Sequence, residues 1–256
     1  MQARKTRQRD RMRRSLQVSL IATFAALHAV LYLASFGLWR NWGIYLAPIE
    51  AITLGPWTGF ASALIGSLTA RTIRFDDATW MFGIIAEPMS VLLTGFLVKT
   101  RWKPVLFAYA VMLTAFFLNP VGATMPLWTM LDILAATLLI IPASKLSTKI
   151  HLTNLRVFAP TIILLSFICV ATDSLVRVFV LIPCGLYNYL AMNADVLHAL
   201  FITSAAESYV EDALVIIATI AVSIPVTKTL MKLQSSVEAE HHQPEHSDSN
   251  PRQNNS

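Results

Sequence analysis

Long apolar runs separated by short polar breaks extend along most of this chain. The runs cover residues 15–38, 44–54, 56–74, 80–99, 104–119, 122–143, 157–184 and 197–231. A helix needs roughly 20 mainly apolar residues to cross a lipid bilayer, and most of the runs are close to that length. We therefore predict an all-α polytopic integral membrane protein, a bundle of about 6–8 transmembrane helices.

Two places leave the number of spans open. The run 44–54 is too short to cross a bilayer by itself. It is followed by Gly55-Pro56, and proline both lacks a backbone donor and disfavours helical geometry in the residue before it. We expect a short second helix broken at Gly55-Pro56. The runs 104–119 and 122–143 are separated by only three residues, so they form either two spans or a re-entrant pair.

Basic residues set the predicted orientation. Residues 1–14 carry seven bases and one acid, and subtracting their net +6 from the total of +5 leaves −1 for the rest of the chain. Bases favour the cytoplasmic side of a membrane. With the N-terminus inside, a break at Gly55-Pro56 also places later bases inside, namely Lys99, Arg101, Lys103, Lys145, Lys149, Arg156, Lys228 and Lys232. We expect a multi-pass protein of the cell membrane with both termini cytoplasmic.

Composition divides the chain into three parts. We expect a basic cytoplasmic arm over 1–14, a transmembrane helical domain over 15–232 and a disordered cytoplasmic tail over 233–256, which is polar and lacks an apolar pattern. Because the excess bases are confined to the arm, nothing indicates a nucleic-acid-binding face. Cys169 and Cys184 lie in or at the end of an apolar run, so we expect two small buried hydrophobic side chains.

Small residues form two stripes. Gly55, Gly59, Ala63, Gly66 and Ala70 are spaced 4, 4, 3 and 4 apart, which places them on one helical face for helix packing. A shorter stripe in the first run contains Ala22 and Ala26. Such faces let another helix approach closely, either inside the same chain or on a second membrane protein.

Ionisable residues inside the apolar runs are candidates for function, because each costs about 2.5–3.5 kcal/mol at the bilayer centre. They are Glu50, Glu87, Asp132, Asp173, Arg177, Glu207, Glu211 and Asp212. Asp173 and Arg177 have the i,i+4 spacing of a helical ion pair. Glu207 and Glu211 have the same spacing with like charges, which indicates either a binding site or a solvated helix start.

A pocket is predicted at the outer ends of the helices, where aromatic, acidic and amide side chains gather. The candidate substrate-binding residues are Trp42, Tyr45, Trp80, Glu87, Arg177, Asn188, Glu207 and Glu211. Interfacial tryptophans and tyrosines can equally form an aromatic belt. Residues 39–47 are short enough to fold over a pocket as a lid.

Motifs for catalysis and for nucleotide binding are missing. The sequence has no GxxxxGK[ST] phosphate loop, HExxH, CxxC or GxSxG. His28, His151 and His198 are isolated in the sequence, so we expect them to be buried or interfacial residues. We assign no catalytic residue, no metal site and no cofactor, and expect the chain not to be an enzyme.

Three stretches resemble the substrate-binding (S) component of energy-coupling factor (ECF) vitamin transporters. The first helix contains the AxxxA of Ala22 and Ala26. The run LAPIEAITLGPWTGFASALIGSLTA (46–70) is similar to the family's short second helix, its Gly-Pro break and its small-residue third helix. ESYVEDALVIIATIAVSIPVTKTL (207–230) resembles the closing helix. The chain departs from the family at 104–143, which adds a helical pair.

The resemblance implies the substrate-capture subunit of an ECF-type ABC importer. Such a subunit binds a small vitamin-like solute on the outer face and docks to a transmembrane T component with two cytoplasmic ATPase subunits. Ala22 and Ala26 would then be partner-docking residues. The excess of acids predicts a solute with an amine or cationic ring, whereas Arg74 and Arg177 would suit a carboxylate or phosphate.

Other functions remain open beside this one. The chain could be a proton-coupled secondary transporter, or another multi-pass permease, with Glu87, Asp132 or Glu207 as a proton relay. A membrane enzyme or assembly factor acting on lipids is a third reading, against which the missing catalytic motifs count.

Overall fold

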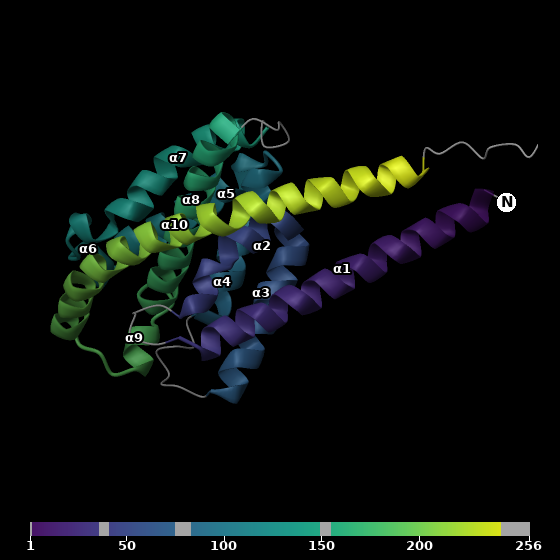
Figure 1. The fold of residues 1–256 in the computed structure, drawn as a ribbon. Coiled ribbons are helices and arrows are strands. Elements are labelled where there is room, and N and C mark those ends of the chain that lie inside the picture. The colour runs from purple at the N-terminus through teal and green to yellow at the C-terminus, as the bar shows by residue number, and fades with distance from the viewer. Residues whose placement is uncertain (1, 36–40, 75–82, 149–154, 242–256) are drawn as a thin grey trace, which may run out of the picture.

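The computed structural model describes residues 2–35, 41–74, 83–148 and 155–241, and helices make up nearly all of this part of the chain, without strands. The elements are α1 (Gln2–Leu33), η1 (Trp42–Tyr45), α2 (Ala47–Leu54), α3 (Pro56–Ile73), α4 (Gly83–Val98), α5 (Trp102–Leu118), α6 (Pro120–Ala123), η3 (Leu127–Met130), α7 (Leu131–Ser147), α8 (Leu155–Leu181), α9 (Leu186–Tyr189) and α10 (Ala194–His241). Figure 1 shows them as a helical bundle.

Within the described residues, three stretches are both long enough and apolar enough to cross a membrane. They are Ser15–Leu33, Leu127–Ser147 and Phe158–Leu181, and they are accompanied by shorter apolar helices at Trp42–Leu54, Gly83–Val98 and Trp102–Leu118. This length and composition indicate a membrane protein.

The predicted break at Gly55-Pro56 is confirmed. α2 ends at Leu54, and Pro56 is the first residue of α3. Gly55 between them has φ +78° and ψ −174°, a combination that is essentially restricted to glycine. A side chain here would have room, since an added Cβ would lie 3.5 Å from Lys99 Cε. Backbone conformation, rather than space, therefore requires glycine at this position.

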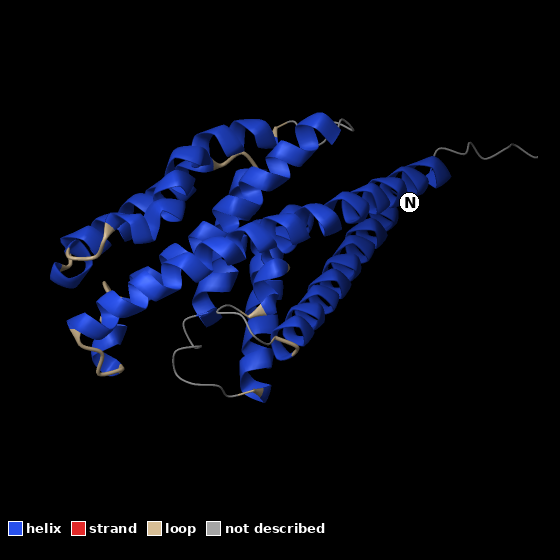
Figure 2. Ribbon diagram, turned by 60° about the vertical axis from the view of Figure 1, so that its left-hand side comes forward, coloured by secondary structure: helices blue, strands red, loops and turns tan. Residues whose placement is uncertain are grey.

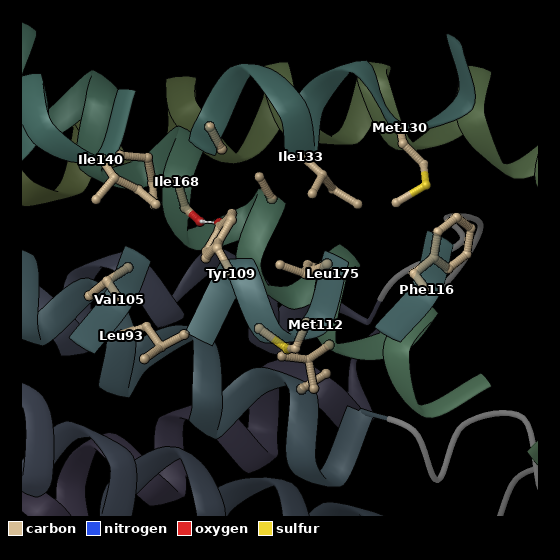
Figure 3. Close-up of a cluster of buried hydrophobic side chains, with 14 of the residues drawn as sticks. Leu93, Val105, Tyr109, Met112, Phe116, Met130, Ile133, Ile140, Ile168 and Leu175 are labelled. Atoms are coloured by element: carbon tan, nitrogen blue, oxygen red, sulfur yellow. Dashed lines mark hydrogen bonds between the residues drawn. The ribbon is translucent and has the colours of Figure 1, made fainter. Parts of the chain in front are cut away.

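Residues 104–143 form two helices, α5 and α7, of 17 residues each, joined by α6 and η3. Both pack against α8 and α4. Their shared core includes Val105, Tyr109, Ile133 and Ile140 (Figure 3). The buried Tyr109 hydroxyl lies 2.8 Å from Thr172 Oγ1 on α8 and so has a hydrogen-bond partner inside this apolar core.

The two long terminal helices leave the bundle on the same side. Figures 1 and 2 both show the start of α1 and the end of α10 running out in one direction. α1 is continuous from Gln2 through the predicted arm into the first apolar run. α10 continues to His241, past residue 233 where the sequence predicts the disordered tail to begin. Residues 242–256 lie outside the described residues.

The small-residue stripe of α3 packs inside the protein. Gly59, Ala63, Gly66 and Ala70 are all buried, and α3 packs against α1 and α4. A Cβ on Gly66 would lie 2.8 Å from the backbone oxygen of Ala25 on α1, so the two helices touch closely there. The stripe is therefore an internal contact.

The stripe of α1 has the opposite environment. Ala25 and Ala29 are buried, whereas Ala22 and Ala26 are exposed on the described surface. α1 thus presents one small-residue face to α3 and leaves another uncovered.

The two cysteines differ in exposure. Cys169 is buried in α8, as expected, and its thiol is free. Cys184 is also free but exposed, so the expectation of a buried side chain was wrong there. The cause is its position three residues after α8 ends at Leu181, in the turn that leads to α9.

Candidate functional site

Nine polar side chains from six segments meet at one place, which we call the polar centre. They are His28 from α1, Asn41 preceding η1, Glu50 from α2, Ser62, Ser67 and Arg71 from α3, Glu87 from α4, and Asp173 and Arg177 from α8. All are buried except Arg177, whose side chain is 19% exposed. Buried ionisable groups in an apolar bundle are costly and mark functional sites.

Glu87 is the hub of the polar centre. Its Oε1 accepts hydrogen bonds from Asn41 Nδ2 (2.5 Å), Arg71 Nη2 (3.0 Å) and Arg177 Nη2 (3.3 Å). Its Oε2 accepts from Ser67 Oγ (2.5 Å) and lies 3.1 Å from His28 Nε2. A carboxylate offers about four acceptor positions. Glu87 therefore has no vacant acceptor position in this arrangement.

His28 joins Glu87 to the second carboxylate of the polar centre. Its Nδ1 lies 3.4 Å from Glu50 Oε2, while Ser62 Oγ donates to Glu50 Oε1 over 3.0 Å. Both ring nitrogens of one buried imidazole thus face carboxylate oxygens from different helices.

Arg177 carries the ion pair predicted from the i,i+4 spacing, which is confirmed. Its Nε donates to Asp173 Oδ2 over 2.7 Å and its Nη2 to Asp173 Oδ1 over 3.2 Å. The same Nη2 also reaches Glu87. On the other side, the Arg71 guanidinium lies 4.8 Å from the centre of the Tyr32 ring, within cation–π range.

Three glycines pack directly against these side chains. A Cβ on Gly43 would lie 2.7 Å from both Asn41 Oδ1 and His28 Nε2, and one on Gly66 would lie 2.7 Å from His28 Cβ. A Cβ on Gly83 would overlap Arg71. The absence of side chains at these glycines therefore lets the backbone close around the polar centre.

The η1 segment is attached to the polar centre through Asn41. Asn41 donates from Nδ2 to Glu87, and its Oδ1 accepts from the backbone N–H of Gly43 over 2.8 Å. The backbone N–H of Trp42 donates to Ser35 Oγ over 2.6 Å, which ties the segment to the end of α1. Residues 41–47 of the predicted lid are thus attached to the polar centre, whereas residues 39 and 40 lie outside the described residues.

The structure brings together only part of the predicted pocket. Glu87 and Arg177 meet, and Trp42 and Tyr45 are half-buried in η1 beside them. Trp80 lies outside the described residues.

The remaining predicted pocket residues lie on α9 and α10. Asn188 on α9 and Glu207 on α10 are exposed at the surface. Glu211 is buried, one turn before Val215, which packs with Ile44 of η1. The like-charged pair Glu207 and Glu211 is therefore divided between surface and interior.

Five members of the polar centre were not among the candidates predicted from the sequence, namely His28, Asn41, Ser62, Ser67 and Arg71. His28 is isolated along the chain but not in space, because α1 packs against α3 beside it. One available signal is the i,i+4 spacing of Ser67 and Arg71, which gives α3 a polar stripe next to its small residues.

The arrangement can hold charge and protons. Among the described residues, no three His, Cys, Asp or Glu side chains are placed to hold a metal ion. The polar centre contains hydrogen-bond donors, acceptors and an imidazole in a buried site, which is the chemistry of polar ligand binding or of proton storage.

Comparison of the chain with protein-family models, with curated proteins and with solved structures finds no match.

Proposed function

We propose that this chain is the membrane-embedded substrate-capture subunit of an ECF-type importer. The observation that carries the proposal is the meeting of Glu87 and Arg177, 90 residues apart, beneath the η1 segment at one end of the bundle. His28, Arg71 and Arg177 all lie near the C-terminal ends of their helices, and Glu87 lies near the start of α4.

The proposed topology makes this end the outer one. With the basic arm of 1–14 inside, α1, α3 and α8 run outward, and their C-terminal ends reach the outer face. The start of α1 and the end of α10 lie on the same side in Figures 1 and 2, which supports placing both termini in the cytoplasm. α5 and α7, at 17 residues or about 26 Å each, support two further spans at 104–143.

The contacts of Glu87 change the expected charge of the solute from positive to negative. An excess of acids suggested a cationic ring, but Glu87 is fully buried and already has five partners. Arg177 is the most exposed member of the polar centre, and guanidinium groups suit carboxylates and phosphates. We therefore propose a vitamin-like solute with an anionic group that reaches Arg177 when η1 opens.

The exposed face of α1 supports a partner. Ala22 and Ala26 are uncovered while Ala25 and Ala29 pack inside, so a second membrane helix could approach closely there. In the proposal this partner is the T component. This sequence has no phosphate loop for nucleotide binding, and in the proposal the two ATPase subunits supply the nucleotide site.

The proposal is tested by expressing the full chain alone and with a T component and its ATPases. We expect solute uptake only in the complete complex. Mass spectrometry of the purified chain identifies any solute that it retains. Uptake driven by an ion gradient in the absence of ATPases would contradict the proposal.

Docking is tested separately with A22L and A26L. Each adds bulk to the exposed face of α1, so we expect partner copurification and uptake to fall at least tenfold while retention of solute is unchanged. The matched control is A110L, at an exposed alanine on α5, for which we expect no effect. Loss of solute retention in A22L and A26L would show that this face serves internal packing.

A proton-coupled secondary transporter is the second candidate. The observation that favours it is His28 placed between Glu50 and Glu87. Of the three proposed relay acids, Glu87 belongs to the polar centre, whereas Glu207 is exposed on α10. Uptake that follows a pH gradient in vesicles containing only this chain would favour this function over the first.

A further inference from the structure

His28 lies between two fully buried carboxylates, those of Glu50 and Glu87. Glu87 also contacts the guanidiniums of Arg71 and Arg177. Within the described part of the chain, the imidazole is the one group that could place a positive charge against Glu50, and it does so only when it carries a second proton. An uncompensated charge in a buried apolar site is strongly unfavourable.

The geometry around the ring leads to the same conclusion. A neutral imidazole has one N–H donor and one lone pair, so one nitrogen of His28 would direct a lone pair at a carboxylate oxygen. Nδ1 faces Glu50 and Nε2 faces Glu87. With a proton on each nitrogen, both contacts become charge-assisted hydrogen bonds.

The hydroxyl of Ser67 indicates that Nε2 of His28 carries a hydrogen. Ser67 Oγ donates its single proton to Glu87 Oε2 over 2.5 Å, and it also lies 3.2 Å from His28 Nε2. Because the single hydroxyl hydrogen is already donated to the hydrogen bond with Glu87, the hydroxyl oxygen can only accept a hydrogen bond from Nε2. Nε2 must then carry a hydrogen.

The pairing of the Glu50 carboxylate depends on a hydrogen at Nδ1, the other ring nitrogen of His28. Its described partners are the Ser62 hydroxyl and His28, so within the described part of the chain the imidazole is its one cationic contact. If Nδ1 lacked a proton, Glu50 would be a buried carboxylate with a single hydrogen-bond donor.

Among the described residues, the groups that face His28 come from several elements packed around it. They are Glu50 from α2, Ser67 from α3 and Glu87 from α4, while Arg71, Arg177 and Asp173 act through Glu87. Next to η1 the facing groups are the uncharged Asn41 and Gly43. α10, which packs on η1 and α2, has Glu211 and Asp212 as buried acids.

We infer that the polar centre is a proton-binding site, in which His28 is held as an imidazolium between Glu50 and Glu87. The bound proton keeps Glu87 in place, and Glu87 holds Asn41 and with it the η1 segment. The inference concerns these side chains alone and stands whether or not the chain carries a solute.

The test uses histidine labelled with ¹⁵N in the full-length chain in lipid nanodiscs. The other five histidines are replaced by glutamine, so that every ring signal comes from His28. We expect both ring nitrogens to be protonated at neutral pH. A neutral ring in this chain would overturn the inference.

E50Q supplies the matched comparison, because it removes one carboxylate with almost no change in shape. The carboxylate that faces Nδ1 is then absent, and the glutamine amide can donate to Nδ1. We expect the ring to become neutral, with its one hydrogen on Nε2. A doubly protonated ring in E50Q would show that Glu50 does not hold the proton and would overturn the inference.

D195N controls for loss of an acid elsewhere, since Asp195 is exposed in the first turn of α10. We expect its ring signal to match that of the unsubstituted chain. H28Q and the double variant H28Q/E50Q form a cycle. H28Q should lower the unfolding temperature more than the double variant does, because only H28Q leaves the buried Glu50 carboxylate without its imidazolium contact. The reverse order would count against the inference.

Discussion

At the scale of single residues, the polar centre is organised by Glu87. One carboxylate accepts from an amide, two guanidiniums and a hydroxyl, and it also contacts an imidazole. Each of these donors comes from a different turn or helix, so Glu87 links the beginning of α4 to four other segments. Its role in this closed arrangement is to hold those segments together.

Removal of the Ser67 hydroxyl tests how much one contact of Glu87 contributes to stability. S67A removes the donor to Glu87 Oε2 and leaves a buried methyl group in its place. We expect a loss of about 1–3 kcal/mol in the free energy of unfolding, because hydrogen bonds to charged groups are strong and buried acceptors are costly to leave unpaired. Denaturant unfolding of the purified chain measures it.

The control for S67A is S19A, at an exposed serine on α1. It should change the free energy of unfolding by less than about 0.5 kcal/mol. Equal effects of the two substitutions would show that the Ser67 contact contributes nothing specific.

At the scale of elements, the turn between α2 and α3 depends on one backbone conformation. Gly55 has φ +78° and ψ −174°, which only glycine adopts without strain. Gly185, before α9, has φ +77° and ψ 17°, a left-handed conformation that other residues tolerate at a smaller cost.

The two glycines therefore make a matched pair for substitution by alanine, since neither lacks space for a Cβ. We expect G55A to lower the free energy of unfolding by about 1–3 kcal/mol and G185A by about 1 kcal/mol. Thermal unfolding of both variants in the same detergent provides the comparison. A larger loss for G185A would contradict the assignment of strain to Gly55.

The elements were predictable because they follow local rules. Apolar runs, proline positions and the Gly55-Pro56 pair define helix boundaries within short windows of sequence. Glu87 and Arg177 were also found, because charge inside an apolar run is visible locally. His28 and Asn41 were not, because their role arises only where α1 and η1 pack against α3 and α4. Contacts between helices that are distant in the sequence produce no periodic pattern of residues along the chain.

At the scale of the whole molecule, the proposed orientation places Cys184 on the outer side, just after α8 ends. We expect a membrane-impermeant thiol reagent to label Cys184 in intact cells and to leave the buried Cys169 unmodified. Mass spectrometry of the digested protein identifies the labelled residue, and C184S is the control that should lose the label. Labelling of Cys184 only after the membrane is inverted would reverse the proposed topology.

The order of the polar-centre residues along the chain bears on how the site forms during synthesis. Residues up to the end of α4 contribute His28, Glu50, Arg71 and Glu87, which are linked by direct contacts. α8 brings Asp173 and Arg177, which form an ion pair within one helix. Because synthesis proceeds from the N-terminus, the contacts among the first four helices can form before α8 is made. α8 then enters with its own acid and base already paired.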